Sequence, residues 1–244
     1  MSENESRELI IELSKVSYAY PGSASKVIDA LDFKFFRGDR VGIMAPNGSG
    51  KTTLFYLIMG LIKPGAGSIS LFGNRVSVEK DFEVIRHRIG FLFQDADDQL
   101  FSPTVLEDVA FGPLNMGKTA ARAREIAEQT LSNLGLEALT HRVTHQLSGG
   151  EKRMVSLATV LAMEPEVLLL DEPSNGLDEA TKQRLIHFLE GLDLSYLVIS
   201  HDHDFLYELS KTNFTMKEGK LSAMGRMHKH YHSHPHTYHT DRKS

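Results

Sequence analysis

A glycine-containing loop at residues 45–53 has the residue types that hold phosphate groups. It reads Ala-Pro-Asn-Gly-Ser-Gly-Lys-Thr-Thr and lies between a predicted strand, Arg40–Met44, and a predicted helix, Gly50–Ile62. The glycines let backbone N–H groups turn inward, and the helix N-terminus adds a partial positive charge. Lys51 can reach the β- and γ-phosphates of a nucleotide, and the Thr52 hydroxyl can ligate Mg²⁺. The order of strand, loop, Lys-Thr and helix predicts a Walker A motif. We expect ATP to contact Asn47, Gly48, Ser49, Gly50, Lys51, Thr52 and Thr53.

The loop departs from the strict pattern at its first position, where Ala45 stands in place of glycine. Alanine adds one methyl group, and the later glycines supply the tight backbone geometry, so we expect the loop to tolerate it. An ordinary glycine-rich turn is the alternative interpretation. The Lys-Thr pair and both flanking elements disfavour that alternative.

Two carboxylates follow another predicted strand and could complete a hydrolytic site. Val167–Leu170 is continuously apolar, as a strand buried on both faces should be, and it runs directly into Asp171 and Glu172. Asp171 could hold Mg²⁺, directly or through water, and Glu172 could polarise the attacking water. A solvated strand end before Pro173 is the alternative. The presence of the phosphate loop favours the hydrolytic interpretation.

Two further polar side chains end predicted strands and could face the same nucleotide. His201 follows the strand Tyr196–Ser200, and its imidazole could contact the γ-phosphate and the attacking water. Gln94 follows the strand Ile89–Phe93, and its carboxamide oxygen could ligate Mg²⁺ and sense the γ-phosphate. A histidine at a strand end is usually structural or merely exposed. Each of the two signals therefore matters only in combination with the loop and the carboxylates.

Composition limits the classes of protein to consider. The chain has 244 residues, no cysteine and a formal net charge of −5. The length suits one large domain or one core with an inserted subdomain, and the lack of cysteine excludes disulfides. An acidic protein is a poor candidate for non-specific nucleic-acid binding, so we expect no nucleic-acid partner. No apolar run approaches the roughly 18 residues of a spanning helix, and the polar start is unlike a signal peptide. Any membrane association should therefore run through a protein partner.

Predicted strands alternate with predicted helices through most of the chain. Further strands are expected at Leu9–Leu13 and Val27–Phe35, and further helices at Thr119–Leu134, Gly149–Met163, Glu179–Glu190 and His203–Leu209. Strands separated by helices predict an α/β fold with a parallel core. Residues 95–162 have mainly helical patterning, which predicts an inserted helical subdomain.

The sequence Leu-Ser-Gly-Gly-Glu at residues 147–151 precedes the two carboxylates and begins a predicted helix. With the phosphate loop, Gln94, the carboxylates and His201 in this order, the chain resembles the nucleotide-binding subunit of an ABC transporter over residues 8–225. The resemblance implies a P-loop NTPase core with an inserted α-helical subdomain and an N-terminal antiparallel β region. It also implies hydrolysis of ATP with Mg²⁺, with Glu172 and His201 as the catalytic residues.

The resemblance further implies that two ATPase subunits, expected to be two copies of this chain, bind head to tail. In the family, this segment of one subunit closes over ATP held by the other, and Ser148 and Gly150 would make that contact. A serine, glycine N–H groups and a helix N-terminus can form a second anion site. Asn175–Asp178 matches the D-loop, which crosses between subunits. Tyr20 matches the aromatic residue that stacks on adenine, although Tyr18 is an alternative, and Tyr20 could instead pack the adjoining turn.

A narrower resemblance lies downstream of Gln94. Residues 93–101, 103–105 and 108–113 are similar to the energy-coupling factor ATPases, and most of all to the ATPase subunits of cobalt and nickel importers. This implies a transmembrane coupling protein and a substrate-binding membrane protein as partners, with the ATPase peripheral on the cytoplasmic face of the cell membrane. In that family the stretch couples to the transmembrane partner, so Asp97, Asp98 and Gln99 are coupling candidates. A solvated acidic loop is the alternative.

The end of the sequence is rich in histidine and has no aliphatic side chains, so we assign residues 1–227 to the ATP-binding domain and 228–244 to a disordered tail. Neutral imidazoles in a flexible chain bind Ni²⁺, Co²⁺, Cu²⁺ or Zn²⁺ readily. The functional interpretation is a metal buffer or sensor, and a passive end or an artificial tag is the alternative. The histidines concerned are His228, His230, His232, His234, His236 and His239.

Taken together, these patterns predict the ATP-hydrolysing subunit of a divalent-metal importer, for cobalt or nickel. The ATPase of a vitamin importer of the same group is one alternative, and the histidine-rich tail is the main argument against it. A soluble ABC ATPase that acts on ribosomes or DNA is a second alternative. The single ATPase unit and the acidic net charge disfavour it.

Overall fold

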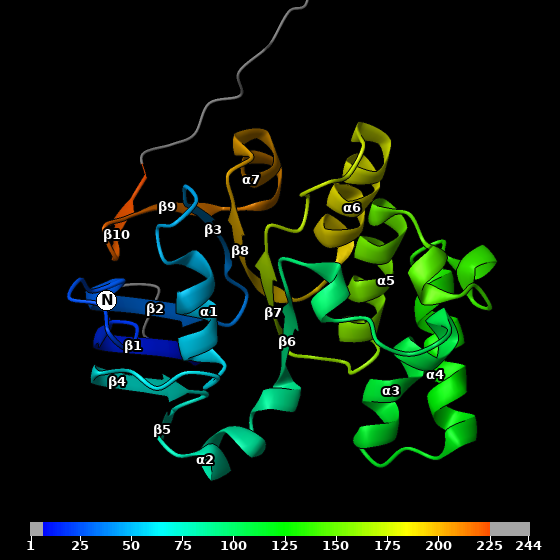
Figure 1. Ribbon diagram of the computed structural model, residues 1–244, viewed down its shortest axis with the longest axis horizontal. Helices are drawn as coiled ribbons and strands as arrows, with labels where there is room; N and C mark the ends of the chain where they lie inside the picture. Colours follow the sequence, from blue (N-terminus) through cyan, green and yellow to red (C-terminus); the bar gives the residue numbers. More distant parts are fainter. Residues whose placement is uncertain (1–6, 225–244) are drawn as a thin grey trace, which may run out of the picture.

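A six-stranded sheet lies at the centre of the computed structural model, which describes residues 7–224 (Figure 1). Its order is β10 (Lys220–Ala223), β9 (Thr212–Lys217), β3 (Arg40–Met44), β8 (Ser195–Ser200), β7 (Val167–Asp171) and β6 (Ile89–Leu92). The strands from β9 to β6 are parallel, and β10 adds an antiparallel edge. Every residue of β7 and β8 is buried, as the apolar runs predict for strands covered on both faces. The histidine-rich segment 228–244 lies outside the described residues, so its metal binding stays a prediction.

The N-terminal part of the chain forms a separate antiparallel sheet, which confirms the predicted antiparallel β region. Its order is β2 (Ile28–Phe36), β1 (Leu9–Tyr18), β4 (Ala66–Leu71) and β5 (Asn74–Val76). Strand β1 continues beyond its predicted end at Leu13, because register shifts after Leu13 and Val16 preserve its pairing with β2.

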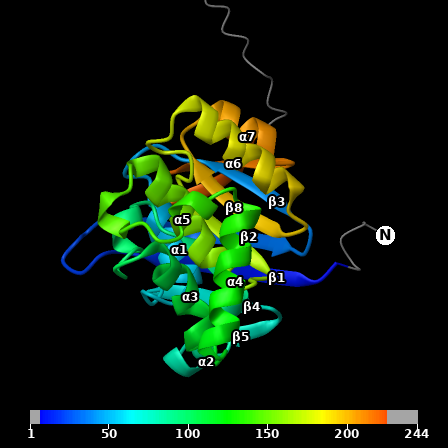
Figure 2. The ribbon, with the colours of Figure 1, turned by 90° about the vertical axis from the view of Figure 1, so that its right-hand side faces the viewer.

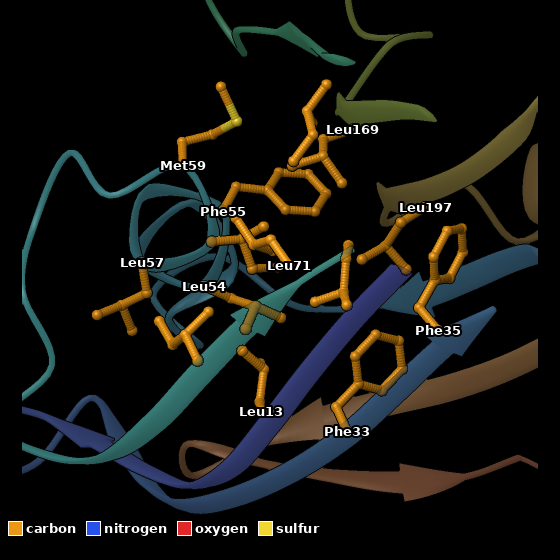
Figure 3. Close-up of a cluster of buried hydrophobic side chains, with 14 of the residues drawn as sticks. Leu13, Phe33, Phe35, Leu54, Phe55, Leu57, Met59, Leu71, Leu169 and Leu197 are labelled. Atoms are coloured by element: carbon orange, nitrogen blue, oxygen red, sulfur yellow. The ribbon is translucent and has the colours of Figure 1, made fainter. Parts of the chain in front are cut away.

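Helix α1 (Lys51–Ile58) lies between the two sheets (Figure 1). Leu54 and Phe55 of this helix are fully buried and belong to one core with Leu13 of the antiparallel sheet and Leu169 of β7 (Figure 3). Because the first residue of this helix is Lys51, the core fixes the end of the phosphate loop.

The opposite face of the six-stranded sheet packs against helices in a second core. Leu169 and Leu197 face the α1 side, whereas their neighbours Leu168 and Val198 belong to the second core, as the period of two along a strand requires. The helices on this side are α5 (Gly149–Leu161), α6 (Glu179–Gly191) and α7 (His203–Leu209). Strand β7 therefore contributes side chains to both cores.

The chain between β6 and β7 is helical, as predicted for residues 95–162, and it faces the viewer in Figure 2. Before β6 lie α2 (Glu79–Glu83) and η2 (Arg86–Arg88). After it come η3 (Ala96–Asp98), α3 (Val105–Asn115), α4 (Ala120–Asn133), η4 (Glu137–Leu139), η5 (Thr144–Gln146) and α5. Helix α4 buries Ala123, Ala127 and Leu131, which recur every fourth residue on its inner face.

Several elements differ from the expectation drawn from the sequence. The sequence patterns do not predict β4, β5, β9 and β10, because these strands lack apolar runs and few of their residues are buried. Helix α1 ends at Ile58 rather than Ile62, because Gly60 adopts a left-handed backbone with φ of +66°.

Candidate functional site

The loop between β3 and α1 has a left-handed backbone at two glycines. Gly48 has a φ of +78° and Gly50 a φ of +94°. Gly50 is the N-cap of α1 and offers no side-chain cap, so the first N–H groups of the helix are available to an anion. The Ser49 hydroxyl is buried and has no hydrogen-bond partner within residues 7–224. These features fit the phosphate groups of a nucleotide.

Ala45 at the start of this loop is fully buried, and its backbone does not lie in the left-handed region. The position therefore does not require glycine. The methyl group packs into the core beneath the loop, which explains how the loop keeps its course despite the departure from the strict pattern.

The Lys51 ammonium reaches from the first turn of α1 to the carboxylate of Glu172. The two side chains form a close ion pair and are only 7% and 1% exposed, respectively. Lys51 Nζ also donates to Asn47 Oδ1 at 3.2 Å. A phosphate that enters the loop must compete with Glu172 for this buried ammonium. The structure thus brings together the predicted phosphate-binding lysine and the predicted catalytic acid.

Asp171, the last residue of β7, faces the second residue of α1. Thr52 Oγ1 donates to Asp171 Oδ2 at 2.7 Å. The other carboxylate oxygen, Oδ1, is buried and has no hydrogen-bond partner in the described part of the chain. Burial raises the pKa of Asp171, while the Thr52 hydrogen bond and the Lys51 charge oppose the rise. A buried carboxylate oxygen without a partner, beside a hydroxyl, fits Mg²⁺.

The Glu172 side chain is held by the end of strand β8. Its Oε2 accepts hydrogen bonds from Ser200 Oγ at 3.3 Å and from the backbone N–H of His201 at 3.2 Å. The same oxygen lies 2.8 Å from His201 Nδ1. Glu172 itself has a φ of +48°, which places a non-glycine residue in the left-handed region. The contacts from β8 fix the direction of a carboxylate whose backbone is strained.

Gln94 shares a cavity with Thr52. The cavity has a volume of about 540 Å³ and is lined also by Gly149 at the start of α5 and by Asn175 after β7. The carboxamide predicted from the end of β6 therefore faces the same space as the hydroxyl that bonds Asp171. This arrangement fits the predicted Mg²⁺ ligands Thr52, Gln94 and Asp171.

Ser148 is the N-cap of α5 and is exposed, as is Gly149. Its hydroxyl accepts a hydrogen bond from the N–H of Glu151 at 3.3 Å, and Glu151 Oε2 accepts one from the N–H of Ser148 at 2.7 Å. Gly150 follows in the first turn of the helix. The N-terminus of α5 is thus an ordered helix end at the surface, where another molecule can reach it.

The family of this chain follows from its similarity to known proteins. Residues 28–175 match the family model described as ABC transporter. The chain belongs to the ABC transporter family. As an ATPase of this family, it carries the phosphate loop at the start of α1 and both acids at the end of β7.

Two relatives of this ABC ATPase have names that agree with the family. It is 48% identical over 227 residues to a putative ABC transporter ATP-binding protein of Nitratidesulfovibrio vulgaris, a match that covers 93% of this chain and 83% of the relative. It is 41% identical over 220 residues to the energy-coupling factor transporter ATP-binding protein EcfA of Methanothermobacter thermautotrophicus, covering 88% and 70%.

A solved structure has the same fold as this ABC ATPase. The structure of cbiO1 from Clostridium perfringens, described as part of the ABC transporter complex cbiONQ, matches with a TM-score of 0.80 and 33% identity. The match covers 90% of this chain and 89% of that chain. The comparisons confirm the predicted fold class and support the predicted energy-coupling factor type.

Arg153 in α5 is a buried residue of the site that the sequence patterns do not single out. Its guanidinium donates to the carbonyl oxygens of Asp171 at 2.5 Å and Glu172 at 2.6 Å, and to that of Gln94 at 3.2 Å. Burial lowers the pKa of Arg153 to about 10. In this ABC ATPase, one side chain therefore ties the helix that begins at Ser148 to the backbone of both acids. Arg153 directly follows the charged residues Glu151 and Lys152, so the local sequence pattern does not mark it.

Tyr20 lies beside the phosphate loop. Its hydroxyl is 2.9 Å from Thr53 Oγ1, and the residue is 44% exposed. Tyr18 contacts the Tyr20 ring edge-on, with centroids 5.1 Å apart, and packs against the core of the ABC ATPase. Tyr20 is therefore the better candidate of the two for stacking on adenine.

Residues 7–224 contain neither a membrane-spanning helix nor a preformed cluster of metal ligands. In this range no helix has the length and hydropathy of a membrane-spanning segment. The same range holds no group of three or more histidine, aspartate or glutamate side chains arranged around a metal site. A Mg²⁺ ion would therefore depend on the nucleotide's own phosphates together with Thr52, Gln94 and Asp171.

Proposed function

We propose that this ABC ATPase is the ATP-hydrolysing subunit of an energy-coupling factor importer for a divalent metal, cobalt or nickel. The observation that carries the proposal is the stretch from Phe93 to Pro113, which resembles those ATPases and follows the strand that ends beside the nucleotide site. The similarity to EcfA and to cbiO1 supports this type of transporter. The cobalt or nickel substrate rests on the sequence resemblance and on the histidines of residues 228–244.

Nucleotide binding follows from the loop. The N–H groups at the start of α1 and the Lys51 ammonium hold the β- and γ-phosphates. Tyr20 stacks on the adenine. Thr52, Gln94 and Asp171 hold Mg²⁺, which when bound neutralises charge on the phosphates.

Hydrolysis follows from the contacts of Glu172. When the γ-phosphate draws Lys51 away, Oε1 of Glu172 loses its buried ion-pair partner and can accept a hydrogen bond from the attacking water. Ser200 and the backbone N–H of His201 hold the other oxygen in place meanwhile. The His201 ring is exposed, so it can contact both Glu172 and the γ-phosphate.

A second copy of the chain supplies the other half of the site. Ser148, Gly149 and Asn175 are exposed, and Ser148 begins a helix whose N-terminus favours an anion. In a head-to-tail pair, Ser148 and Gly150 contact the γ-phosphate held by the partner's loop. ATP then joins the two subunits, and hydrolysis separates them.

The transmembrane coupling protein docks beside the Gln94 loop, at the cytoplasmic face of the membrane. Phe101 is 65% exposed and Phe111 43% exposed, and their rings meet edge-on with centroids 4.7 Å apart. A pair of exposed aromatic rings suits a protein partner better than solvent. Asp98 is exposed in the same stretch and supplies an acidic contact.

The other two coupling candidates have contacts within the chain. Asp97 forms an ion pair with Lys152 of α5 at 2.6 Å. The Gln99 carboxamide donates to the Ser156 carbonyl oxygen at 2.7 Å and accepts from the N–H of Phe93 at 3.3 Å. Both side chains therefore attach the coupling stretch to α5. A displacement of this stretch by the transmembrane partner would thus also displace the helix that begins at Ser148.

Purification of the complex from membranes tests the proposal. The full chain is expected to co-purify with two membrane proteins and to support ATP-dependent uptake of radiolabelled Co²⁺ or Ni²⁺. If the complex takes up a vitamin and no metal, the chain is the ATPase of a vitamin importer and the metal importer is rejected. Recovery of the chain only in the soluble fraction, bound to ribosomes or DNA, would reject the transporter.

A further inference from the structure

Asp108 on α3 is a buried carboxylate that neither nucleotide binding nor hydrolysis uses. The residue is 3% exposed. Its Oδ1 accepts hydrogen bonds from the backbone N–H groups of Phe101 at 3.1 Å and Ser102 at 2.8 Å. Its Oδ2 accepts one from the Thr144 hydroxyl at 3.2 Å. A buried carboxylate held by neutral donors has a high desolvation cost, so its neighbours are strongly constrained to face it.

The donors belong to two segments that are far apart in sequence. Phe101 and Ser102 lie within the stretch from Phe93 to Pro113, and Thr144 precedes the Ser148 segment. The backbone reinforces the junction, because the Thr144 N–H donates to the carbonyl oxygen of Pro103 at 3.1 Å. Asp108 therefore fastens the two segments to each other within the helical region.

A short, well-held connection leads from Thr144 to Ser148. Thr144 is the first residue of the turn η5, and only His145, Gln146 and the buried Leu147 separate it from Ser148. The Arg142 guanidinium donates to the carbonyl oxygen of Gln146 at 3.2 Å, which closes this turn. The position of Thr144 thus sets the position of the α5 N-terminus.

We propose that Asp108 is a positioning residue for ATP-driven pairing of two chains. Through Thr144 it fixes the Ser148 anion site relative to the Gln94 loop, so that the site meets the phosphates on the second copy. The inference rests on the head-to-tail pair proposed above. Loss of the bond is expected to leave nucleotide binding on the chain's own loop intact while weakening the pair.

The test varies Thr144, because removing Asp108 would leave two backbone N–H groups unpaired and could unfold the segment. Thr144→Val keeps the shape and removes the hydroxyl, whereas Thr144→Ser keeps the hydroxyl. Thr119→Val is the matched control, since it removes the side-chain cap of α4, which accepts from the N–H of Arg122, without touching Asp108. All are made in the full chain carrying Glu172→Gln, which should trap ATP.

Light scattering with MgATP measures the dimer dissociation constant, and a fluorescent ATP analogue measures binding to the monomer. We expect Thr144→Val to weaken the dimer about tenfold, with nucleotide affinity within about twofold, and Thr144→Ser and Thr119→Val to pair like the parent. If Thr144→Val and Thr119→Val have equal dimer dissociation constants, the proposed role of Asp108 is wrong, whereas the head-to-tail pair is unaffected. If the parent itself does not pair with ATP, the head-to-tail assembly is wrong, and the inference falls with it. Loss of monomer nucleotide binding in Thr144→Val would show a merely structural role and reject the proposal.

Discussion

The geometry at Gly50 makes a quantitative prediction for the phosphate loop. A Cβ built there would lie 2.8 Å from Val27 Cγ1 and 2.9 Å from the Val27 carbonyl oxygen, at a φ of +94°. The left-handed backbone costs a non-glycine residue about 1–2 kcal/mol, and forcing a methyl group against backbone costs about 1–3 kcal/mol. Gly50→Ala should therefore lower the free energy of unfolding by about 3 kcal/mol. For a chain of this size that corresponds to a Tm lower by about 6–12 °C.

Two other glycines separate the backbone cost from the clash. Gly48 has a φ of +78° and Gly73 a φ of +77°, and a Cβ at either would meet nothing within 4 Å. Each change to alanine should cost only about 1 kcal/mol. Gly48 lies in the phosphate loop and Gly73 in the turn between β4 and β5, so only Gly48→Ala should also weaken ATP binding.

Urea denaturation of the three variants and titration with a fluorescent ATP analogue check these values. The expected order of unfolding free energies is wild type, then Gly48→Ala and Gly73→Ala together, then Gly50→Ala. Equal destabilisation by all three would mean that the Val27 carbonyl moves aside without cost. Unchanged ATP binding by Gly48→Ala would contradict the assignment of the loop as the phosphate site.

Three further predictions concern the acids and the lysine. Glu172→Gln should lower the rate of ATP hydrolysis by at least about a hundredfold while ATP still binds, and full turnover in that variant would remove Glu172 from its role. Lys51→Ala should weaken ATP binding by at least about tenfold, measured by calorimetry, because it removes the ammonium proposed to hold the β- and γ-phosphates. Unchanged affinity would contradict the loop assignment. Hydrogen bonds from Arg88, then from Arg37, lower the pKa of Glu166 from 4.5 to about 2. Because the folded-state pKa is depressed, this stabilisation is present above about pH 4.5 and is lost as the pH falls towards 2. Glu166 is one third exposed, so solvent screening reduces the contribution of these ion pairs to the free energy of unfolding to about 1 kcal/mol. The Glu166→Gln variant should therefore unfold at a lower urea concentration than the wild type at pH 7, but not near pH 2.

The nucleotide site could be predicted from the sequence because its signals are local. Lys51 follows β3 after the short glycine-containing loop, and Asp171 ends the apolar strand β7. The ends of parallel strands in one sheet meet at the same edge. The same reasoning predicted Gln94 and His201 from single strand ends. The functional roles of these residues stay predictions until variants are measured.

The supporting contacts could not be predicted, because their partners are backbone groups from distant segments. Arg153 bonds carbonyl oxygens of residues near 94 and near 172, and Asp108 bonds N–H groups near 101. Every residue carries such backbone groups, so the sequence does not indicate which of them a buried charged side chain will bond. Strands β9 and β10 could not be predicted for a related reason. β9 is held by its pairing with β3, and β10 by its pairing with β9, rather than by an apolar pattern of their own.

The backbone of Glu172 has a consequence for engineering. Its φ of +48° is a conformation that glycine adopts without penalty, whereas glutamate loses about 1–2 kcal/mol there. Glycine at position 172 would relieve this cost, but it would also leave the buried Lys51 ammonium without its ion-pair partner and remove the acid proposed to activate water. The backbone angle and the carboxylate therefore act in opposite directions on stability at one residue.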